Sequence, residues 1–469
     1  MLQHLRRVGR PESFRASGSV VLLACIGVAV TLVAVASSAA VSAPSFARPM
    51  TYPTASMPGQ VALGDLNGDG KPDLAIAADG PVSVLLNRGD GTFQQRRDYA
   101  TRVGGHESVA IGDLNSDGKL DLVLSNGGAN TISVLLGNGD GSFQPGRDYA
   151  AGAAPISVAI ADLNGDGHLD VAAAREGTGQ DITHGALVVF FGKGDGSLQA
   201  RRDYPTGTTP GTLVLGDVNG DGKPDLAIFN ERGAPGANTV SVFTNDGAGG
   251  FQARRNYQTG ITPRALAIGD LNGDNRLDLA VATERANTVS VLINRGDGTF
   301  RPKRDYATGY LPGTVAIGDL NGDGKPDIAT GGSAFLTRPT TLSVLIGKGD
   351  GSFEPRLEYA AGGFATRLAI GDLNGDDKPD LAVTHALYGA TVSVLFNAPV
   401  HCTVQDVRRM TLAAAKRMIA LASCHVGKVR RAYSKTVRRG RVISQKPKPG
   451  AVLPNGGKVD FVFSSGRKR

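Results

Sequence analysis

The stretch Asp65-Leu66-Asn67-Gly68-Asp69-Gly70-Lys71-Pro72-Asp73 decides the fold, because close variants of it recur along the chain. Each copy lies between two short apolar runs, which favour β-strands bounded by turn residues. A period of about 50 residues is typical of propellers and solenoids, whose units bury their faces against their neighbours. The copies therefore predict an all-β, seven-bladed β-propeller. They begin at Asp65, Asp113, Asp162, Asp217, Asp270, Asp319 and Asp372.

Oxygen-bearing side chains occupy positions 1, 3, 5 and 9 of every copy. This alternation directs successive oxygens at one hard cation, and calcium takes about six to eight oxygen ligands. The main-chain carbonyl of position 7 would add another ligand. Position 6 is Gly, Asn275 or Asp377, which tolerate a left-handed backbone. The predicted side-chain ligands of up to seven Ca²⁺ ions are Asp65, Asn67, Asp69, Asp73, Asp113, Asn115, Asp117, Asp121, Asp162, Asn164, Asp166, Asp170, Asp217, Asn219, Asp221, Asp225, Asp270, Asn272, Asp274, Asp278, Asp319, Asn321, Asp323, Asp327, Asp372, Asn374, Asp376 and Asp380.

The alternative is ordinary turn chemistry, because Asp, Asn and Gly dominate turns. Charge favours the metal sites. Residues 47–400 hold 29 Lys and Arg against 40 Asp and Glu, a net charge of −11. Three carboxylates in each loop would repel one another without a counter-ion. We therefore expect chelation to lower the thermal stability of the repeats.

Each repeat contains four short strands, separated by turns that leave no room for helices. In the second repeat we expect them at Ser108–Ile111, Asp121–Leu124, Ile132–Leu136 and Ser142–Tyr149. The third and fourth strands are joined by a Gly-Asp-Gly hairpin at 139–141, a composition that suits left-handed turns.

The seventh repeat ends at Asn397 without a fourth strand. The missing strand is found at the other end of the repeats, where Phe46 and Tyr52 match Phe143 and Tyr149 in spacing. We therefore expect the N-terminal strand to complete the seventh blade, which would cover the exposed sheet edges of an open array.

Alternating strand directions place the acidic loops and the Gly-Asp-Gly turns on one rim of the ring. The loops between second and third strands lie on the other rim, and they are longest at 175–185, 231–238 and 331–340. Variable loops on a rigid scaffold commonly carry binding residues. Insertions without a ligand are the alternative. The predicted ligand face contains Arg175, Asp181, His184, Arg232, Phe335 and Arg338.

The seven Asp-x-Asn-x-Asp-x-x-x-Asp loops, with their Gly-Asp-Leu-Asn-Gly context, resemble the FG-GAP/VCBS repeat family. That family includes the calcium-loop propellers of integrin α-subunit heads and many bacterial surface proteins. The resemblance covers residues 45–397 and implies structural calcium sites, within a propeller domain of residues 44–398. It does not imply an integrin.

The N-terminal segment has the layout of a secretory signal. Residues 1–18 carry four Arg against one acid, and a mostly apolar run from Val20 to Val35 is followed by small residues. We assign residues 1–43 to this signal, with cleavage preferred after Ala40. An uncleaved anchor is the alternative, since 19–41 is long enough to span a membrane. Either outcome predicts a secreted or cell-surface bacterial protein.

The C-terminal segment, residues 399–469, differs sharply in composition. Residues 401–469 hold 17 Lys and Arg against 2 acids, a net charge of +15. We expect a helix over 411–422, and strands over Gly427–Tyr433, Arg441–Ser444 and Lys458–Phe463. Cys402 and Cys424 bracket the helix, and in an oxidising compartment we expect them to form a disulfide.

This segment resembles a single PASTA domain, a small module of bacterial cell-wall kinases and penicillin-binding proteins. The resemblance is carried by 404–407, 410–415, 426–429, 442–450 and 457–459, although the usual Val-Pro-Asp opening reads Val-Gln-Asp here. It implies association with peptidoglycan. The basic charge would also suit anionic wall polymers, lipid headgroups or nucleic acid, but no nucleic-acid-binding motif supports the last of these.

No catalytic motif is present: the seven His are scattered singly, and the paired acids belong to the loops. We therefore expect a monomeric, secreted or surface-displayed binding or adhesion protein and not an enzyme. Its partner would be a wall or surface polymer, such as peptidoglycan or an anionic glycan, or a protein. We expect no nucleic-acid partner, and membrane contact only through an uncleaved N-terminus. The alternative function is a polysaccharide lyase or hydrolase built on the same ring.

Overall fold

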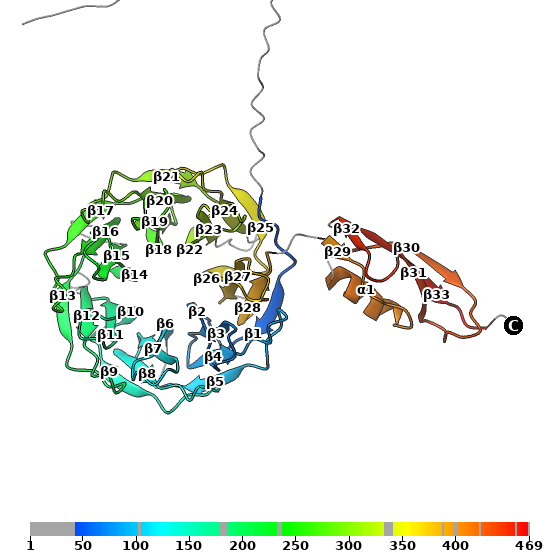
Figure 1. Cartoon of the computed structure of the whole chain (residues 1–469), viewed down its shortest axis with the longest axis horizontal. Helices are drawn as coiled ribbons and strands as arrows, with labels where there is room; N and C mark the ends of the chain where they lie inside the picture. The colour runs from blue at the N-terminus through cyan, green and yellow to red at the C-terminus, as the bar shows by residue number, and fades with distance from the viewer. Residues whose placement is uncertain are drawn as a thin grey trace, which may run out of the picture. The chain divides into compact units, whose positions relative to one another are not determined.

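The structure is a computed structural model, which describes residues 43–101, 105–177, 185–207, 209–231, 237–332, 341–386, 389–397, 401–421, 424–454 and 457–467. Within these ranges, seven four-stranded antiparallel sheets surround a common centre (Figure 1). The prediction of a seven-bladed propeller is confirmed. A smaller module with one helix follows the last blade in sequence.

The strands of each blade are consecutive in sequence, and we number the blades in chain order. Blades 1 to 4 contain β2 (Val61–Gly64), β3 (Asp73–Ile76), β4 (Pro81–Leu85), β5 (Arg97–Ala100); β6 (His106–Gly112), β7 (Asp121–Asn126), β8 (Thr131–Leu135), β9 (Arg147–Ala150); β10 (Pro155–Ala161), β11 (Asp170–Arg175), β12 (Ala186–Phe190), β13 (Arg202–Pro205); and β14 (Pro210–Gly216), β15 (Asp225–Asn230), β16 (Thr239–Phe243), β17 (Arg255–Gln258). Blades 5 to 7 contain β18 (Pro263–Gly269), β19 (Asp278–Thr283), β20 (Thr288–Leu292), β21 (Arg304–Ala307); β22 (Pro312–Gly318), β23 (Asp327–Gly332), β24 (Thr341–Leu345), β25 (Leu357–Ala360); and β26 (Ala365–Gly371), β27 (Asp380–His385), β28 (Thr391–Leu395) with β1 (Met50–Pro53).

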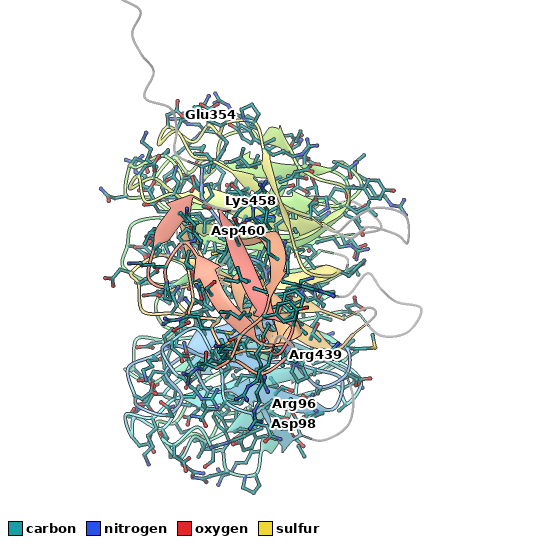
Figure 2. All side chains as sticks on the ribbon, turned by 90° about the vertical axis from the view of Figure 1, so that its right-hand side faces the viewer. Arg96, Asp98, Glu354, Arg439, Lys458 and Asp460 are labelled. Atoms are coloured by element: carbon teal, nitrogen blue, oxygen red, sulfur yellow. The ribbon has the colours of Figure 1, made fainter. Side chains whose placement is uncertain are left out.

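The hydrophobic core lies between neighbouring blades. One cluster joins Val84 of blade 1 to Leu122 and Leu124 of blade 2, and equivalent clusters follow around the ring. The second strands are almost wholly buried, whereas the outer strands expose charged side chains such as Asp98, which pairs with Arg96 at 3.0 Å (Figure 2). Burial on both faces explains why the second strands read as continuous apolar runs.

A repeated aromatic contact joins each outer strand to the next blade. The ring of Tyr99 on β5 meets Phe143 of blade 2 edge-on at 5.1 Å, and its hydroxyl donates to the carbonyl oxygen of Gly141 at 2.8 Å. Such edge-to-face pairs add about 0.5–1.5 kcal/mol to the burial of the rings. In blade 3 a leucine, Leu198, stands at the Phe position, and Tyr149 meets Phe190 instead.

The N-terminal strand lies where the sequence predicted it. β1 pairs with β28 as the outer strand of blade 7, and Tyr52 pairs with Val392 in the register (Figure 1). Phe46 forms a bridge with Asn397 and meets Tyr359 of blade 6 at 5.0 Å. The first described residues are therefore bound to both of the last two blades.

The C-terminal module contains a three-stranded sheet, a two-stranded sheet and a helix. Thr411 caps the helix by accepting a hydrogen bond from the backbone N–H of Ala414 at 3.2 Å. Ile419 of the helix packs with Val442 and Phe461 of the sheet. The elements are β29 (His401–Thr403), α1 (Leu412–Leu421), β30 (His425–Ala432), β31 (Val442–Lys446), β32 (Val452–Pro454) and β33 (Lys458–Ser464).

Several strand boundaries differ from the sequence prediction. The fourth strand of blade 2 begins at Arg147 and not at Ser142, because Phe143 makes only an isolated bridge with Gly137. The short strands β29 and β32 of the module were not predicted. Cys424 is disulfide-bonded, while its pairing with Cys402 stays a prediction.

The predicted signal or anchor was residues 1–43, and all of it except residue 43 lies outside the described residues. Among the residues that the structure describes, no helix is both long and apolar enough to cross a membrane.

Candidate functional site

The seven acidic loops share one backbone conformation. Position 6 is left-handed in every loop, including Asn275 and Asp377, whose φ angles are both 61°. This agrees with the expectation from the residue types at that position. Position 4 is left-handed too, even where it is Ser116, with a φ of 58°. The second left-handed residue was not anticipated, and it explains why position 4 is Gly in the other six loops.

The oxygens of positions 1, 3 and 5 are held by the backbone of the same loop. In the first loop the two oxygens of Asp65 accept the N–H groups of Asp69 and Gly70, at 3.0 and 2.7 Å. Asn67 Oδ1 also accepts the N–H of Asp69 at 3.0 Å, and Asp69 Oδ1 accepts that of Lys71 at 3.1 Å. These four contacts recur in all seven loops. Each loop is therefore prefolded around its oxygen-bearing side chains.

Position 9 has a structural role that the sequence did not reveal. Asp73 is fully buried, and its two oxygens accept the N–H groups of Leu66 and Asn87 at 3.0 and 2.7 Å. The same pair of contacts recurs in the other six blades. In blades 1 to 6 this carboxylate joins the acidic loop to the start of the hairpin between the third and fourth strands. In blade 7 it joins the loop to Asn397, which follows β28.

Burial raises the pKa of every position-9 carboxyl. The pKa is about 6 for Asp73, Asp278, Asp327 and Asp380, and it is raised in the other three blades as well. The two N–H donors oppose this shift. The carboxylates at positions 5 and 1 of the same loop add to it, which means that the three acids of a loop repel one another.

The loops fit a hard divalent cation in their donor chemistry. Carboxylate and amide oxygens at positions 1, 3 and 5 are the ligands that Ca²⁺ prefers. Asp65 Oδ2, for example, accepts one N–H and keeps a second lone pair. In the described ranges, however, no three His, Cys, Asp or Glu side chains converge as a metal-binding group. Position 3 is Asn, and the position-9 carboxylate faces backbone N–H groups. The buried aspartate and the prefolded loop are compatible with calcium sites.

The predicted ligand face is only partly described. Arg175 ends β11 on the rim opposite the acidic loops, and its side chain pairs with Asp203 of the same blade at 3.2 Å. With 17% of its side chain exposed, Arg175 contributes to the blade itself. The other five predicted residues, Asp181, His184, Arg232, Phe335 and Arg338, lie outside the described residues.

A cavity of about 520 Å³ opens on this same rim. Ile156 lies at the start of an inner strand that runs toward an acidic loop, and Glu176 directly follows a second strand that returns from that loop. The lining is therefore at the end of the blades that faces away from the loops. The cavity is lined by Gly105, Gly127, Gly128, Ala154, Ile156, Glu176, Thr209, Pro210, Gly211, Thr212, Phe229, Glu231, Arg264, Glu284, Gly313, Phe364, Ala365, Thr366 and Arg367.

Charged side chains of different blades meet in this cavity. Arg264 donates from Nε to Glu284 at 2.9 Å and from Nη1 to Glu231 of the preceding blade at 3.2 Å. Only 12% of the Glu231 side chain is exposed, so this ion pair is partly shielded from water. The network presents carboxylate acceptors and guanidinium donors together, a combination that suits a polar ligand with several hydroxyl or amide groups.

Sequence reasoning missed these cavity residues, because they come from six blades and are far apart in the chain. The sequence signal that could have identified some of them is a glutamate at the same position in three repeats. Glu176, Glu231 and Glu284 each follow the end of a second strand directly, at β11, β15 and β19.

Comparisons with known proteins agree with this architecture. The FG-GAP-like repeat family matches residues 65–124, 113–173, 178–228, 217–281 and 270–330, which is more than half of the chain. The PASTA domain family matches residues 403–465.

Individual relatives match only parts of the chain or only the fold. A probable serine/threonine-protein kinase PknB of Lactococcus lactis is 31% identical over 80 residues, 17% of this chain and 13% of the kinase. The chain thus spans about an eighth of the length of that curated relative.

Two solved structures are similar, each with a TM-score of 0.45. A lectin of Agrocybe aegerita that recognises non-reducing terminal N-acetylglucosamine is 22% identical, over 64% of this chain and 79% of the lectin. A protein of unknown function from Desulfotomaculum acetoxidans is 13% identical, over 67% of this chain and 91% of that protein. At these scores neither structure carries an argument about a ligand.

Proposed function

This chain belongs to the FG-GAP-like repeat family and ends in a PASTA domain, and on that basis we propose that it is a secreted or cell-surface calcium-binding adhesion module. The observation that supports this proposal most is the sevenfold repetition of one prefolded acidic loop on one rim, with a polar cavity on the opposite rim. The loops would stabilise the ring, and the cavity side would take the ligand.

Positions 1, 3 and 5 of each loop would hold the Ca²⁺, together with the position-7 carbonyl. The bound cation supplies charge neutralisation for three acids that otherwise repel one another. Residues of the loop itself hold these ligands in position. Backbone N–H groups orient Asp65 and Asp69, and Asp73 ties the loop to the hairpin beside it. Calcium binding in one loop would therefore reinforce the contact between neighbouring strands of its blade.

The PASTA domain would place the protein at the cell wall. PASTA domains are typically extracytoplasmic and bind peptidoglycan-like ligands, and the module's charge of +15 suits a wall that carries anionic polymers. The propeller would then be displayed outside the cytoplasm, where calcium is plentiful, with its cavity rim available to a glycan or protein partner.

Calorimetric titration of the purified chain with CaCl₂ tests the calcium part. We expect up to seven sites, with dissociation constants of about 10⁻⁴–10⁻³ M. Replacing the position-5 Asp of all seven loops by Asn should abolish most of the heat. An absence of calcium uptake by the wild-type chain would refute this part of the proposal.

A glycan array and a peptidoglycan pull-down, each with and without calcium, test the ligand part. Arg264→Met should weaken a ligand that binds at the cavity, because the variant removes the donor that holds Glu231 and Glu284. Arg301→Met is a matched control, since Arg301 is exposed on an outer segment away from the cavity. Equal binding by both variants would exclude the cavity as the ligand site.

A polysaccharide-active enzyme on the same ring is the second candidate. The cavity places Glu231, Glu284 and Arg264 together, and paired carboxylates are the groups that glycoside hydrolysis requires. Turnover of a bound array sugar, lost in Glu231→Gln and Glu284→Gln, would favour this candidate over binding alone.

A further inference from the structure

The C-terminal module has far more cations than acids, since residues 401–469 contain 17 Lys and Arg. Residues 401–469 contain two acids. Asp406 receives two hydrogen bonds from the guanidinium of Arg408, the shorter at 2.6 Å. Asp460 accepts the backbone N–H of Lys428 at 2.6 Å. Arg439 and Lys458 are among the exposed cations (Figure 2). Two acids cannot pair with 17 cations, so most of the positive charge of the module has no counter-charge within the module.

One part of this basic surface also exposes an aromatic ring. Tyr433 follows β30 directly and is 63% exposed, the highest value among the large hydrophobic side chains of the described residues. Most of the surface of this tyrosine is therefore open to solvent. The ring presents an apolar face and a polar hydroxyl group to solvent, and such rings contribute strongly where they contact a partner.

The backbone around Tyr433 is well tethered. Ser434 N donates to the carbonyl oxygen of Gly466 at 2.9 Å, and Ser434 Oγ accepts the N–H of Val437 at 2.9 Å. Ser464 Oγ donates to the carbonyl oxygen of Val437 at 2.8 Å. The segment after β30 is thereby joined to the end of β33, which holds the tyrosine beside the C-terminal strand.

An open cavity of about 540 Å³ lies at this junction and is lined by Tyr433, Ser434, Lys435 and Arg467. It combines an aromatic face, a hydroxyl and two cations. Arg431, at the end of β30, stacks over the ring of Phe463 at 5.2 Å and adds a third cation near the junction. Arginine binds phosphate or carboxylate through two parallel N–H groups, and lysine binds them as a point charge.

From this arrangement we propose that the cavity at Tyr433 binds an anionic glycan, in which a sugar ring lies next to a phosphate or a carboxylate. The apolar face of a pyranose packs on the tyrosine ring, the serine hydroxyl meets a sugar hydroxyl, and Lys435 and Arg467 hold the anion. A neutral glycan leaves the two cations unused. A polyanion without sugar rings leaves the tyrosine unused. This inference rests on the proposed association with the cell wall and names the polymer class that the module recognises.

Binding of the full chain to four immobilised polymers tests the inference: neutral dextran, inorganic polyphosphate, phosphorylated dextran and hyaluronate. We expect at least tenfold tighter binding to phosphorylated dextran or hyaluronate than to either dextran or polyphosphate. The comparison of phosphorylated dextran with hyaluronate identifies the anion as phosphate or carboxylate. Binding should weaken as NaCl is raised from 50 to 200 mM.

Three variants separate the site from general charge attraction. Tyr433→Ala should weaken binding to the sugar-bearing polyanion about tenfold and leave polyphosphate binding unchanged. The double variant Lys435→Gln/Arg467→Gln should weaken both. Lys416→Gln on the exposed side of α1 removes one positive charge away from the cavity and should have little effect.

Two results would overturn the inference: polyphosphate binding as tight as that of the best glycan, or no effect of Tyr433→Ala on any polymer. Calcium titration of the same variants tests the two proposals separately. If calcium binding is unchanged while glycan binding is absent, the inference about the module fails and the proposed calcium binding by the propeller does not.

Discussion

The propeller and the C-terminal module carry opposite charges and hold them in opposite ways. The repeats have a net charge of −11, and many of their acids are held by backbone N–H groups inside loops or blades. The module has a net charge of +15, and most of its cations are exposed. The acids of the propeller therefore stabilise its loops and blades through backbone hydrogen bonds, whereas the cations of the module are exposed to a partner.

Deletion of residues 43–53 should have the largest effect on this comparison. The deletion removes β1 and Phe46, and with them the outer strand of blade 7 and its contacts to blade 6. We expect the cooperative unfolding transition of the propeller to be lost in calorimetry, while that of the module is kept. A peptide of residues 43–56 added in trans should restore the transition. An unchanged propeller transition would show that ring closure does not depend on this strand.

Removal of a single position-9 carboxylate should have the second-largest effect on stability. In calcium-free buffer, Asp278→Ala leaves the N–H groups of Leu271 and Asn294 buried without an acceptor, which should lower the free energy of unfolding by about 3 kcal/mol. Asp274→Ala, in the same loop, is the matched variant. It should cost less stability but remove calcium binding by that loop. Urea denaturation with and without CaCl₂ measures both effects, and equal losses from the two variants would contradict the separate roles.

The pH dependence of stability should change sign with calcium. Four position-9 acids have a folded pKa of about 6, and the pKa of the other three is raised above the unfolded value of about 3.8. The folded state therefore binds more protons than the unfolded state over this pH range. Without calcium, the melting temperature of the propeller should therefore rise as pH falls from 7 to 4.5. With excess calcium it should fall, because the metal requires ionised ligands.

One buried histidine opposes the calcium-free trend. His385 Nδ1 donates to the carbonyl oxygen of Phe364, and Nε2 forms a hydrogen bond with Ser393 Oγ. Burial lowers the pKa of His385, so its contribution to stability is lost as pH falls below the ordinary pKa of histidine. The effect of this single histidine on the pH dependence of stability should be smaller than that of the seven position-9 acids. A calcium-free propeller whose melting temperature falls steadily on acidification would show that the raised carboxyl pKa values do not govern its stability.

The smallest effect is expected at the exposed ion pair of the module. Arg408 holds the pKa of Asp406 at about 2, but both side chains are exposed to water. Exposed pairs contribute little to stability because water and salt screen them. We expect Arg408→Ala to leave the melting temperature of the module unchanged within error. A clear decrease would mean that the module depends on its acids as the propeller does.

Much of the fold could be predicted from the sequence, because it is repeated. The number of acidic loops predicted the number of blades. The match of Phe46 and Tyr52 to Phe143 and Tyr149 predicted the closing strand. Position 6 of the loops was predictable from residue type alone. The short strands β29 and β32 were missed, since three residues carry no periodic pattern.

The candidate sites were less predictable. The position-9 aspartates were expected among the metal ligands, but their burial and their contacts to the next hairpin depend on how the strands pack. The cavity residues Glu231, Arg264 and Glu284 come together only when blades 4 and 5 lie side by side. Tyr433 and Arg467 are 34 positions apart in the chain and meet at one cavity.

The sequence by itself determined the repeat, the ring of seven blades, the acidic loops and the change of charge at the last blade. These features depend on residue type and spacing, which are local. The tertiary structure alone decided which carboxylates are buried, which blades share the polar cavity, and which aromatic ring of the module stays exposed beside two cations. These features depend on contacts between residues far apart in the chain, which the spacing of residues within one repeat does not specify.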